Sequence, residues 1–444
     1  MRSTSVRRVT GRWALALAVL ALWACSSAPR APARPVPVPA VPVPVLASRP
    51  VAPVVVAQAP VPAAPAASAP ALPVESAAVA ARFPDPLVSY RTPAFEPGRA
   101  SFTSNAELRS LLHGLARDGA GSATLSAATT IRLLQVGSSQ SGVPLEALHF
   151  SRTPLALAAT GASAPPARPT VLLVGQQHGD EPAGAEALIV IAQELAGGQL
   201  APLLDRIDVV ILPRANPDGA AADRRLTASG IDANRDHLLL RTPEAQAQAQ
   251  LVREFNPTVV VDAHEFSVLG RYLEKFGAVQ RFDALIQYAM TANLPEFVTK
   301  ASEEWFRKPM LQALSAQGLS HEWYYTTSTD LSDKKVSMGG VQPDTGRNVN
   351  GLRNAVSFLI ETRGAGLGRA HLLRRVHTQV TAISSVLQSA AARADDLLKL
   401  RRFVDADVAA KACQGEAIVE AAATPGEYNL PMLDPQTEIG RAHV

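Results

Sequence analysis

The chain has 444 residues, of which 47% are hydrophobic, so it can bury a substantial core and is not disordered as a whole. Its formal charge of +3 is small for this length, and lysine and arginine are scattered along the chain. This pattern excludes the basic footprint of a nucleic-acid-binding protein, and we expect no nucleic acid as a partner.

The first 25 residues have the features of an export signal. A basic start precedes an apolar run over Trp13–Trp23, which is too short to span a membrane. Leu22-Trp-Ala-Cys25 resembles a bacterial lipoprotein cleavage site, in which Cys25 is acylated and becomes the first residue. The alternative is ordinary signal-peptidase cleavage near Ala24. We expect export to the periplasm and a lipid anchor in the bacterial outer membrane, without a membrane span.

Residues 26–82 consist mostly of proline, alanine and valine and carry almost no charge. This composition predicts a disordered, polyproline-like linker between the anchor and a folded domain that begins at residue 83. Cys413 is the only cysteine besides Cys25, so an intramolecular disulfide would require Cys25. If Cys25 is lipidated, no intramolecular disulfide can form, and the hydrophobic core alone must stabilise the fold.

A helix and a hairpin are predicted at the start of the folded domain. Ser104-Asn-Ala-Glu107 has the spacing of a capping box, and leucines spaced by threes and fours follow it, which predicts a helix over 105–117. Thr130–Val136 and Leu145–Ser151 are predicted as two strands that form a hairpin across a turn-rich gap.

Buried strands are predicted to alternate with helices in the central part of the chain. Pro182 and Thr242-Pro243 are typical of helix starts. The alternation favours an α/β fold: a single domain with a mixed, largely parallel sheet flanked by helices. The predicted buried strands are Thr170–Gly175, Ile207–Leu212, Thr258–Val261 and Ala355–Ile360.

The C-terminal part is predicted to be an extension of this domain. From His371 to Phe403 the apolar spacing is helical, and Ala417–Ala422 is strand-like. We therefore divide the chain into a main folded domain over 83–370 and an extension over 371–437, which we expect to be truncated. Residues 438–444 match one reading frame of a common sequencing adapter, which predicts a non-native tail. Resequencing the 3′ end of the gene from genomic DNA tests this, and the same codons there would refute it.

His178 and Glu181 lie in the loop after the strand at Thr170–Gly175. Alone, this spacing is common by chance, and a lone histidine at a strand end is more often structural than a metal ligand. His264 and Glu361 follow two other predicted strands, however, and ligands bind at the carboxyl ends of parallel strands. Two imidazoles and one carboxylate form a zinc-ligand set that leaves a fourth position open for water, as in catalytic rather than structural sites.

With these residues the sequence resembles the zinc carboxypeptidases, the carboxypeptidase A-like metallopeptidases, over residues 133–364. Several motifs occur in the order typical of that family, and a chance match to all of them is implausible. They are His178-Gly-Asp-Glu181, Asn216-Pro-Asp-Gly219, Arg225, Gly230-Ile-Asp-Ala-Asn-Arg235, Asp262-Ala-His264 and Ile360-Glu361.

The resemblance implies a zinc site and a general base. His178, Glu181 and His264 would bind one Zn²⁺ per chain, which would polarise a substrate carbonyl and lower the pKa of bound water toward about 7. Glu361 would take the proton of the water and pass it to the leaving amine. The alternative for Glu361 is an ion pair with Arg363.

The resemblance also implies roles in the loop between these ligands. Arg225 would stabilise the oxyanion, with Arg224 as its rival. Asn234 and Arg235 would hold the terminal carboxylate of the substrate. Asp232 would orient the first zinc histidine by accepting its second N–H. The alternative for the whole loop is a solvated run of charges.

The sequence departs from the family's pattern around the substrate pocket. Glu265-Phe266 follows His264, where small or hydroxyl residues are usual, and Asp236-His237 follows Arg235 in place of an aromatic residue. The family's mobile tyrosine, 22 residues before the catalytic glutamate, is replaced by Gly339. These differences put the shape of the pocket in question.

Three further residues are candidates for contacts with the substrate. Tyr324 or Tyr325 would cover the substrate from a lid loop, with ordinary aromatic packing as the alternative. The segment Met338–Arg353 is predicted as a wall of the pocket, and its Arg347 as the partner of an acidic group on the substrate.

Taken together, the resemblance implies an exported zinc metallocarboxypeptidase that hydrolyses a peptide bond near a free carboxyl end or trims muropeptides. One alternative is an exported amidase or deacylase of the same superfamily, acting on cell-wall peptides or acylated amino acids. The other is a non-enzymatic surface binding protein, which would have no need of a general base. We expect a monomer whose partner is a peptide or muropeptide and whose only membrane contact is the lipid anchor.

Overall fold

The computed structural model describes residues 75–119, 127–154, 167–414, 416–419, 426–436 and 440–443. The predicted export signal, Cys25 and the linker up to residue 74 lie outside these residues. None of the described helices is long and apolar enough to cross a membrane.

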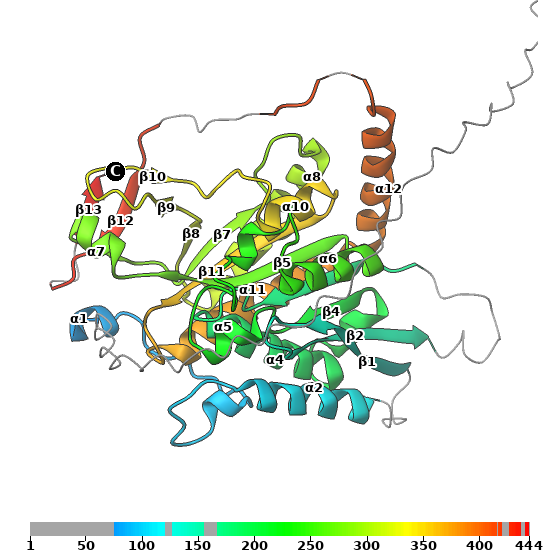
Figure 1. Ribbon diagram of the computed structural model, residues 1–444, viewed down its shortest axis with the longest axis horizontal. Coiled ribbons are helices and arrows are strands. Elements are labelled where there is room, and N and C mark those ends of the chain that lie inside the picture. Colours follow the sequence, from blue (N-terminus) through cyan, green and yellow to red (C-terminus); the bar gives the residue numbers. More distant parts are fainter. Residues whose placement is uncertain are drawn as a thin grey trace, which may run out of the picture. The chain divides into compact units, whose positions relative to one another are not determined.

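Eight strands form the central sheet (Figure 1). They are β1 (Ala127–Ser138), β2 (Pro144–Pro154), β3 (Thr170–Gly175), β4 (Asp208–Leu212), β5 (Val259–Ser267), β7 (Ala284–Tyr288), β8 (His321–Trp323) and β11 (Val356–Ala365). Their order is β1-β2-β4-β3-β5-β11-β7-β8. The pairs β4/β3, β3/β5, β5/β11 and β7/β8 are parallel, and the other three pairs are antiparallel. The predicted α/β fold with a mixed, largely parallel sheet is confirmed, and β1 and β2 form the predicted hairpin.

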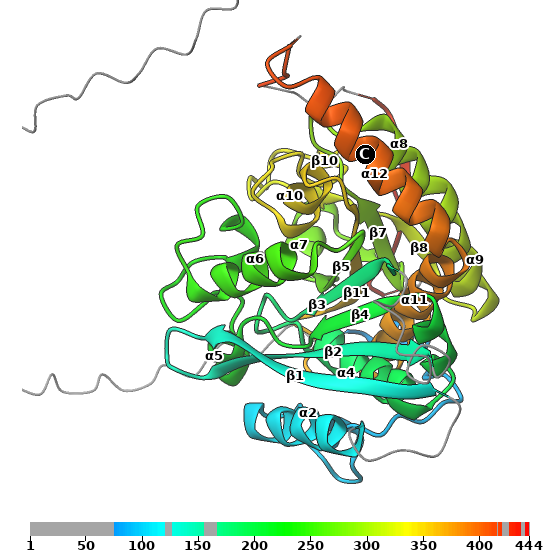
Figure 2. The same cartoon turned by 90° about the vertical axis from the view of Figure 1, so that its right-hand side faces the viewer.

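Helices cover both faces of the sheet (Figures 1 and 2). One layer consists of α2 (Asn105–Gly119), α4 (Pro182–Gly197), α9 (Lys308–Ala316) and α11 (Leu372–Ala392), and α6 (Pro243–Phe255) covers the other face. Successive side chains of a strand point to opposite faces, so Leu173 packs in the first layer and its neighbour Leu172 beneath α6. Burial on both faces explains why the central strands are unbroken apolar runs.

The helix starts are fixed by the predicted caps. At α2 the amide of Ser104 donates to Glu107 Oε2 over 2.8 Å, and the amide of Glu107 donates to Ser104 Oγ over 3.3 Å, which is a capping box. At α6 the Thr242 hydroxyl accepts from the amide of Ala245 over 3.2 Å. Proline occupies the first turn of α4 and of α6, where its missing N–H costs nothing.

Shorter elements connect these layers. They are α1 (Ala77–Ala80), α5 (Pro217–Ala221), α7 (Arg271–Phe276), α8 (Glu296–Ala301), α10 (Gly346–Leu352), 3₁₀ turns at Pro93–Phe95, Ala201–Asp205 and Ala233–Arg235, a π-helical segment at Ser302–Arg307, and the strands β6 (Val279–Gln280), β9 (Thr326–Thr327) and β10 (Val336–Ser337).

The folded part begins earlier than predicted. The composition predicts a disordered linker up to residue 82, but residues 75–82 include α1, where Val79 is buried. The carboxylate of Glu75 accepts from Arg363 Nη2 over 2.6 Å and lies 3.0 Å from His371 Nε2. The alanine-rich composition does not predict these contacts of Glu75, because Arg363 and His371 lie almost 300 residues away in the sequence.

The predicted helical region after residue 371 is divided into α11 and α12 (Ala394–Ala410). Ile383 and Val386 of α11 are fully buried in the same core cluster as the central strands. This helix is therefore part of the main core.

The predicted strand at Ala417–Ala422 is wrong for its described part. Residues 417–419 have no regular structure, and Val419 is 98% exposed. The amide and the carbonyl of Ile418 bond to the side chain of Asn293 and not to a strand. Instead β12 (Asn429–Leu433) pairs with β6 and with β13 (Gly440–His443), and Leu430 and Met432 of β12 are buried. The suggested foreign origin of residues 438–444 stays a prediction.

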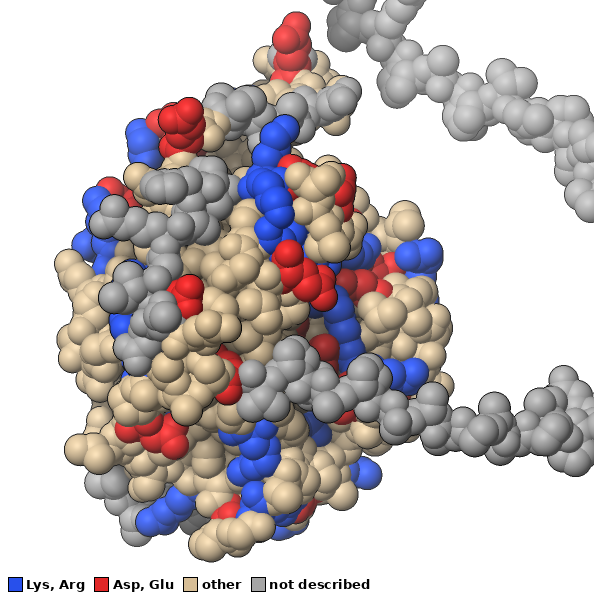
Figure 3. Space-filling model, turned by 90° about the vertical axis from the view of Figure 1, so that its left-hand side faces the viewer, with Lys and Arg blue, Asp and Glu red and all other residues tan. Residues whose placement is uncertain are grey.

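On the face shown in Figure 3, acidic and basic side chains are interspersed and do not form separate fields of one sign.

Candidate active site

The sheet itself brings the predicted site residues together. β3 ends at Gly175 and leads into the loop that carries His178, while β5 carries His264 and β11 carries Glu361. In the pairing of β11 with β5, Glu361 is the direct partner of His264. Parallel strands present their carboxyl ends at one edge, so these residues meet there.

Three side chains converge as metal ligands. The Nδ1 atoms of His178 and His264 lie 2.8 Å from Oε1 and Oε2 of Glu181, respectively, and 3.1 Å from each other. All three residues are buried. Ligand atoms about 2.0–2.2 Å from one tetrahedral zinc ion lie roughly 3.3 Å apart, so a small outward shift of these side chains would accommodate the ion. The predicted zinc ligands are confirmed, and within the described part of the chain no other group of three such side chains converges.

The electrostatics of this group also suit a cation. Burial alone would raise the pKa of Glu181, but the imidazoles of His178 and His264 outweigh it and lower that pKa. Burial lowers the pKa of His264, yet Asp262 and Glu181 raise it well above its usual value. The carboxylate thus draws positive charge onto the imidazoles, and a bound metal ion would supply that charge in place of protons.

Each zinc histidine has its own carboxylate on the far side of the ring. His178 Nε2 lies 3.0 Å from Asp232 Oδ1, where the prediction requires Asp232. His264 Nε2 lies 2.9 Å from Asp262 Oδ1. A metal on Nδ1 requires the hydrogen on Nε2, and the Nε2–H of His178 then donates to Asp232 Oδ1. His264 Nε2 faces Asp262 at ion-pair distance and also lies 3.1 Å from Asn234 Nδ2. Sequence reasoning noticed the motif Asp262-Ala-His264 but gave Asp262 no role, although residues i and i+2 of a strand share a face.

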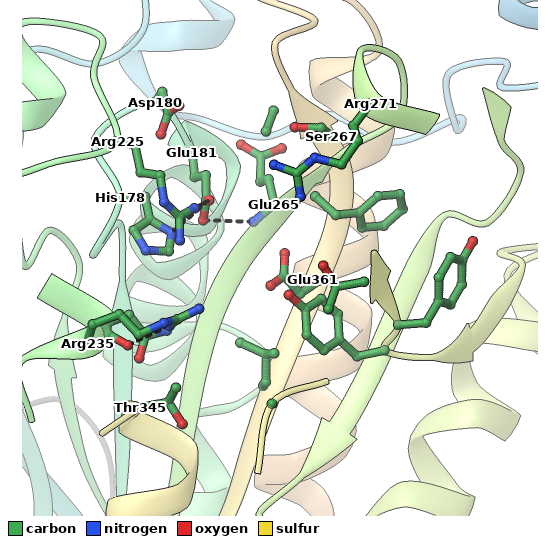
Figure 4. Close-up of a pocket in the computed structure, with 18 of the residues that line it drawn as sticks. His178, Asp180, Glu181, Arg225, Arg235, Glu265, Ser267, Arg271, Thr345 and Glu361 are labelled. Carbon is green, nitrogen blue, oxygen red and sulfur yellow. Dashed lines mark hydrogen bonds and ion pairs between the residues drawn. The ribbon is translucent and has the colours of Figure 1, made fainter. Parts of the chain in front are cut away.

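Glu361 is buried at the pocket, with His178, Glu181 and Arg225 along one side of it (Figure 4). Burial and the nearby carboxylate of Glu181 raise the pKa of Glu361 to about 7. A carboxyl group with a pKa near neutrality suits a general base. The alternative, an ion pair between Glu361 and Arg363, is not formed, because Arg363 pairs with Glu75.

Arg225, and not its neighbour Arg224, faces the ligands. Its Nη2 donates to Asp232 Oδ2 over 2.8 Å and its Nη1 donates to Glu181 Oε1 over 3.3 Å. The Arg225 side chain is 42% exposed, which leaves it accessible to a substrate. Arg224 is exposed and does not line the pocket. The loop is therefore not a solvated run of charges.

Asn234 and Arg235 line the same pocket. Asn234 is buried, and its Oδ1 accepts from the amide of Gly346 over 2.8 Å. Arg235 Nη1 donates to the carbonyl of Asn234 over 2.7 Å. In Figure 4, Arg235 points into the pocket from the wall opposite Arg271. Both residues lie at the pocket, where Asn234 Nδ2 also contacts Asp262 Oδ2 at 3.4 Å and His264 Nε2 at 3.1 Å. Their role in binding a carboxylate stays a prediction.

The two candidate tyrosines differ in their surroundings. Tyr325 is 5% exposed and packs edge-on against Tyr272 at 6.0 Å, and its hydroxyl has no hydrogen-bond partner. Tyr324 lies 5.7 Å beneath the guanidinium of Arg347, and burial together with the charge of Glu361 raises its pKa. Tyr324 is therefore the one beside the catalytic groups, whereas Tyr325 belongs mainly to a core cluster.

The pocket has a volume of about 690 Å³. The segment Met338–Arg353 forms part of its wall, as predicted, and contributes Gly340, Gln342, Asp344, Thr345 and Arg347. Other lining residues belong to no predicted motif, and only the fold brings them to the pocket. They include Arg271, Tyr272 and Gln280. Asp180, which the motif His178-Gly-Asp-Glu181 contains without a predicted role, also lines the pocket.

The motif Asn216-Pro-Asp-Gly219 supports the site from behind. Asn216 caps α5 by accepting from the amide of Gly219, and its Nδ2 donates to the carbonyls of Gln177 and Arg225. Gly179 approaches this turn so closely that any Cβ atom would overlap the backbone of Gly219. The motif thus ties the first zinc-ligand loop to the loop of Arg225.

Comparisons with known proteins identify one family. The sequence model described as zinc carboxypeptidase matches residues 124–366. Carboxypeptidase 2 of Trichophyton rubrum is 35% identical over 243 residues, which are 53% of this chain and 45% of that protein. Carboxypeptidase 2 of Trichophyton equinum is 34% identical over the same shares. The chain spans about half the length of these curated relatives.

A crystal structure of a metallo-carboxypeptidase from Burkholderia cenocepacia aligns with a TM-score of 0.46 and 16% identity, over 65% of this chain and 70% of that one. The family sequence model covers more than half of the 444 residues and includes the three zinc ligands and Glu361. The chain therefore belongs to the zinc carboxypeptidase family.

Proposed function

We propose that this protein is a zinc-dependent carboxypeptidase that hydrolyses the peptide bond next to a free carboxyl end. The observation that carries the proposal is the direct pairing of Glu361 with His264 across two neighbouring strands. This register sets a buried base beside a metal ligand, and a binder without chemistry would not need such a base. Membership in the family supports the same activity.

His178, Glu181 and His264 would hold the zinc ion, which when bound acts as a Lewis acid on the scissile carbonyl and makes water more acidic. Glu361 takes the proton of the attacking water and returns it to the nitrogen of the leaving amine. Its raised pKa allows both steps near neutral pH.

The pocket residues position the substrate in this proposal. Arg225 donates hydrogen bonds to the oxyanion that forms from the carbonyl oxygen, where a fixed positive charge has its largest effect. Asn234 and Arg235 hold the terminal carboxylate, for which a guanidinium offers two parallel N–H donors. Tyr324 lines the pocket together with Glu361 and would cover the substrate from there.

Hydrolysis of N-acylated dipeptides with a free carboxyl end, compared with the same dipeptides as carboxyl amides, tests the proposal. We expect cleavage only of the free acids. Equal or faster cleavage of the amides would contradict the role of Asn234 and Arg235. Preferential cleavage of N-acetyl amino acids would support the deacylase alternative, and preferential cleavage of muropeptides would identify a cell-wall substrate.

We further propose that the protein is exported and tethered by a lipid on Cys25, supported by the basic, apolar and cysteine-containing pattern of residues 1–25. Expression of the full chain in a bacterium, followed by fractionation, tests this. The wild type should sediment with membranes, and Cys25→Ala should appear in the soluble fraction. Equal distribution of both proteins would refute lipidation.

A further inference from the structure

A buried arginine in the pocket wall has fewer partners than its charge requires. Arg347, in the first turn of α10, is 3% exposed and lines the pocket. Its Nη2 donates to the carbonyl of Gly340 over 2.6 Å, and its Nε is buried without a partner. Asp344 also lines the pocket, but it forms no ion pair with Arg347, and its Oδ1 has no partner.

Other buried arginines of this molecule have a paired carboxylate or an acceptor for each nitrogen. Arg375 pairs with Glu265 through two nitrogens, and Arg363 pairs with Glu75 through Nη2, although its Nε and Nη1 have no partner. Arg214 has no carboxylate, but each of its three nitrogens donates to an oxygen. Burying a charge is costly unless it is paired, so Arg347 stands out as a buried cation that neither forms an ion pair nor has an acceptor for its Nε.

The surroundings of Arg347 fit a carboxylate on a short stem. Tyr324 and Leu359 line the same pocket and offer apolar surface for methylene groups. Burial lowers the pKa of Arg347 more than the charges of Tyr324 and Glu361 raise it, and the positive charge of Arg235 lowers it further. A substrate carboxylate in contact with the guanidinium would offset the cost of this burial. With Arg235 assigned to the terminal carboxylate, the pocket has cations for two anionic groups.

We propose that this pocket selects peptides whose last residue has an acidic side chain, and that Arg347 is the residue that determines this specificity. The inference rests on the proposed carboxypeptidase activity. The planar guanidinium binds the side-chain carboxylate through parallel N–H donors, and its charge disfavours a lysine or arginine at the same place.

The test compares N-acylated dipeptides that differ only in the last residue: glutamate, phenylalanine or lysine. The zinc-loaded wild type should have the highest kcat/KM for glutamate and the lowest for lysine. In Arg347→Met the ratio of kcat/KM for glutamate to that for phenylalanine should fall by roughly 10- to 100-fold, because a charged hydrogen-bonded pair is lost. Arg347→Lys should keep part of the preference, since it keeps the charge but not the planar fork.

The control is Arg353→Met, which removes one exposed positive charge just after the same helix and should leave the ratio unchanged. Because both substrates are measured on one preparation, partial unfolding of a variant cancels from the ratio. An unchanged ratio in Arg347→Met, or a wild-type preference for phenylalanine or lysine, would overturn the inference.

Calorimetric binding to a zinc-loaded Glu361→Gln background separates the two proposals. If the wild type hydrolyses no peptide, the proposed function fails. Tighter binding of the dipeptide ending in glutamate, lost on adding Arg347→Met, would still support the selective pocket. Equal affinity for all three dipeptides would overturn it even in an active enzyme.

Discussion

The two zinc histidines are held in different ways. His178 lies in a loop, and its supporting carboxylate, Asp232, is 19% exposed and bound by the half-exposed Arg225. His264 lies in β5, and its supporting carboxylate, Asp262, is 3% exposed. The backbone carbonyl of His264 also accepts from Gln379 Nε2 of α11 over 2.9 Å. One half of the site is therefore a polar loop open to the pocket, and the other is part of the core.

The strand-borne half has a buried ion pair beneath it. Glu265, next to His264, accepts from Arg375 Nε over 2.7 Å and from Nη2 over 2.9 Å, and also from the amide of Ala183 in the first turn of α4. Any Cβ atom at Gly364 would overlap this pair. The residue that departs from the family's pattern thus locks β5, α4 and α11 together. The core half therefore fixes the metal ligand in place, while the loop half remains available to the substrate.

The largest expected effect is on kcat, through Glu361, which is the strand partner of His264 in the core half. Glu361→Gln should lower kcat by about 10²–10⁴-fold while zinc content, measured by elemental analysis, stays at one per chain. The matched control is Glu254→Gln, an exposed position on α6. Undiminished turnover in Glu361→Gln would remove this residue from the mechanism.

Removal of the ion pair beneath His264 should destabilise the fold. Arg375→Ala leaves the Glu265 carboxylate buried without its partner, so we expect the free energy of unfolding to fall by about 3–5 kcal/mol, measured by urea denaturation. Arg402→Ala, an exposed residue of α12, should change it by less than about 0.5 kcal/mol. Equal effects of the two variants would show that α11 does not support the core half.

The two orienting carboxylates can be compared directly. Asp232→Asn and Asp262→Asn should each weaken zinc binding by about 10–100-fold, measured by competition with a chelator. Only Asp262→Asn should also lower the unfolding free energy, by about 1–3 kcal/mol, because its environment is buried. Asp223→Asn, exposed in the neighbouring loop, is the control. A similar loss of unfolding free energy in Asp232→Asn would contradict the inference that only the core half contributes to the stability of the fold.

The smallest expected effect is on the pH profile. Glu361 must be ionised to act as a base, so kcat/KM should fall as the pH decreases through its pKa, which burial and Glu181 raise and which the positive charges of Arg225 and of bound zinc lower. Arg225→Gln removes one of these charges and should move the acid limb of the profile to higher pH, by a few tenths of a unit to about one unit. Arg224→Gln should leave the limb unmoved. A shift to lower pH in Arg225→Gln would contradict the sign of this interaction.

Local patterns in the sequence predict the central strands, one helix start and the zinc ligands. The apolar runs gave β3, β4, β5 and β11, and the capping box at Ser104 gave the start of α2, because burial and capping act on neighbouring residues. The order of motifs gave the zinc ligands. The composition of residues 26–82 predicts a linker. It does not predict the ion pair of Glu75, because the partner, Arg363, lies far along the chain.

Which of the candidates meet at the site depends on packing between distant segments. Arg225 lines the pocket and Arg224 does not, and Tyr325 packs on Tyr272 whereas Tyr324 lies beside Arg347. Side-chain direction in such loops follows no period that the sequence shows. Strand β5 sets the carboxylate of Asp262 beside His264 Nε2, and Arg347 is buried without an ion pair. Spacing fixes which side chains the chain offers, whereas strand register and packing fix which of them meet.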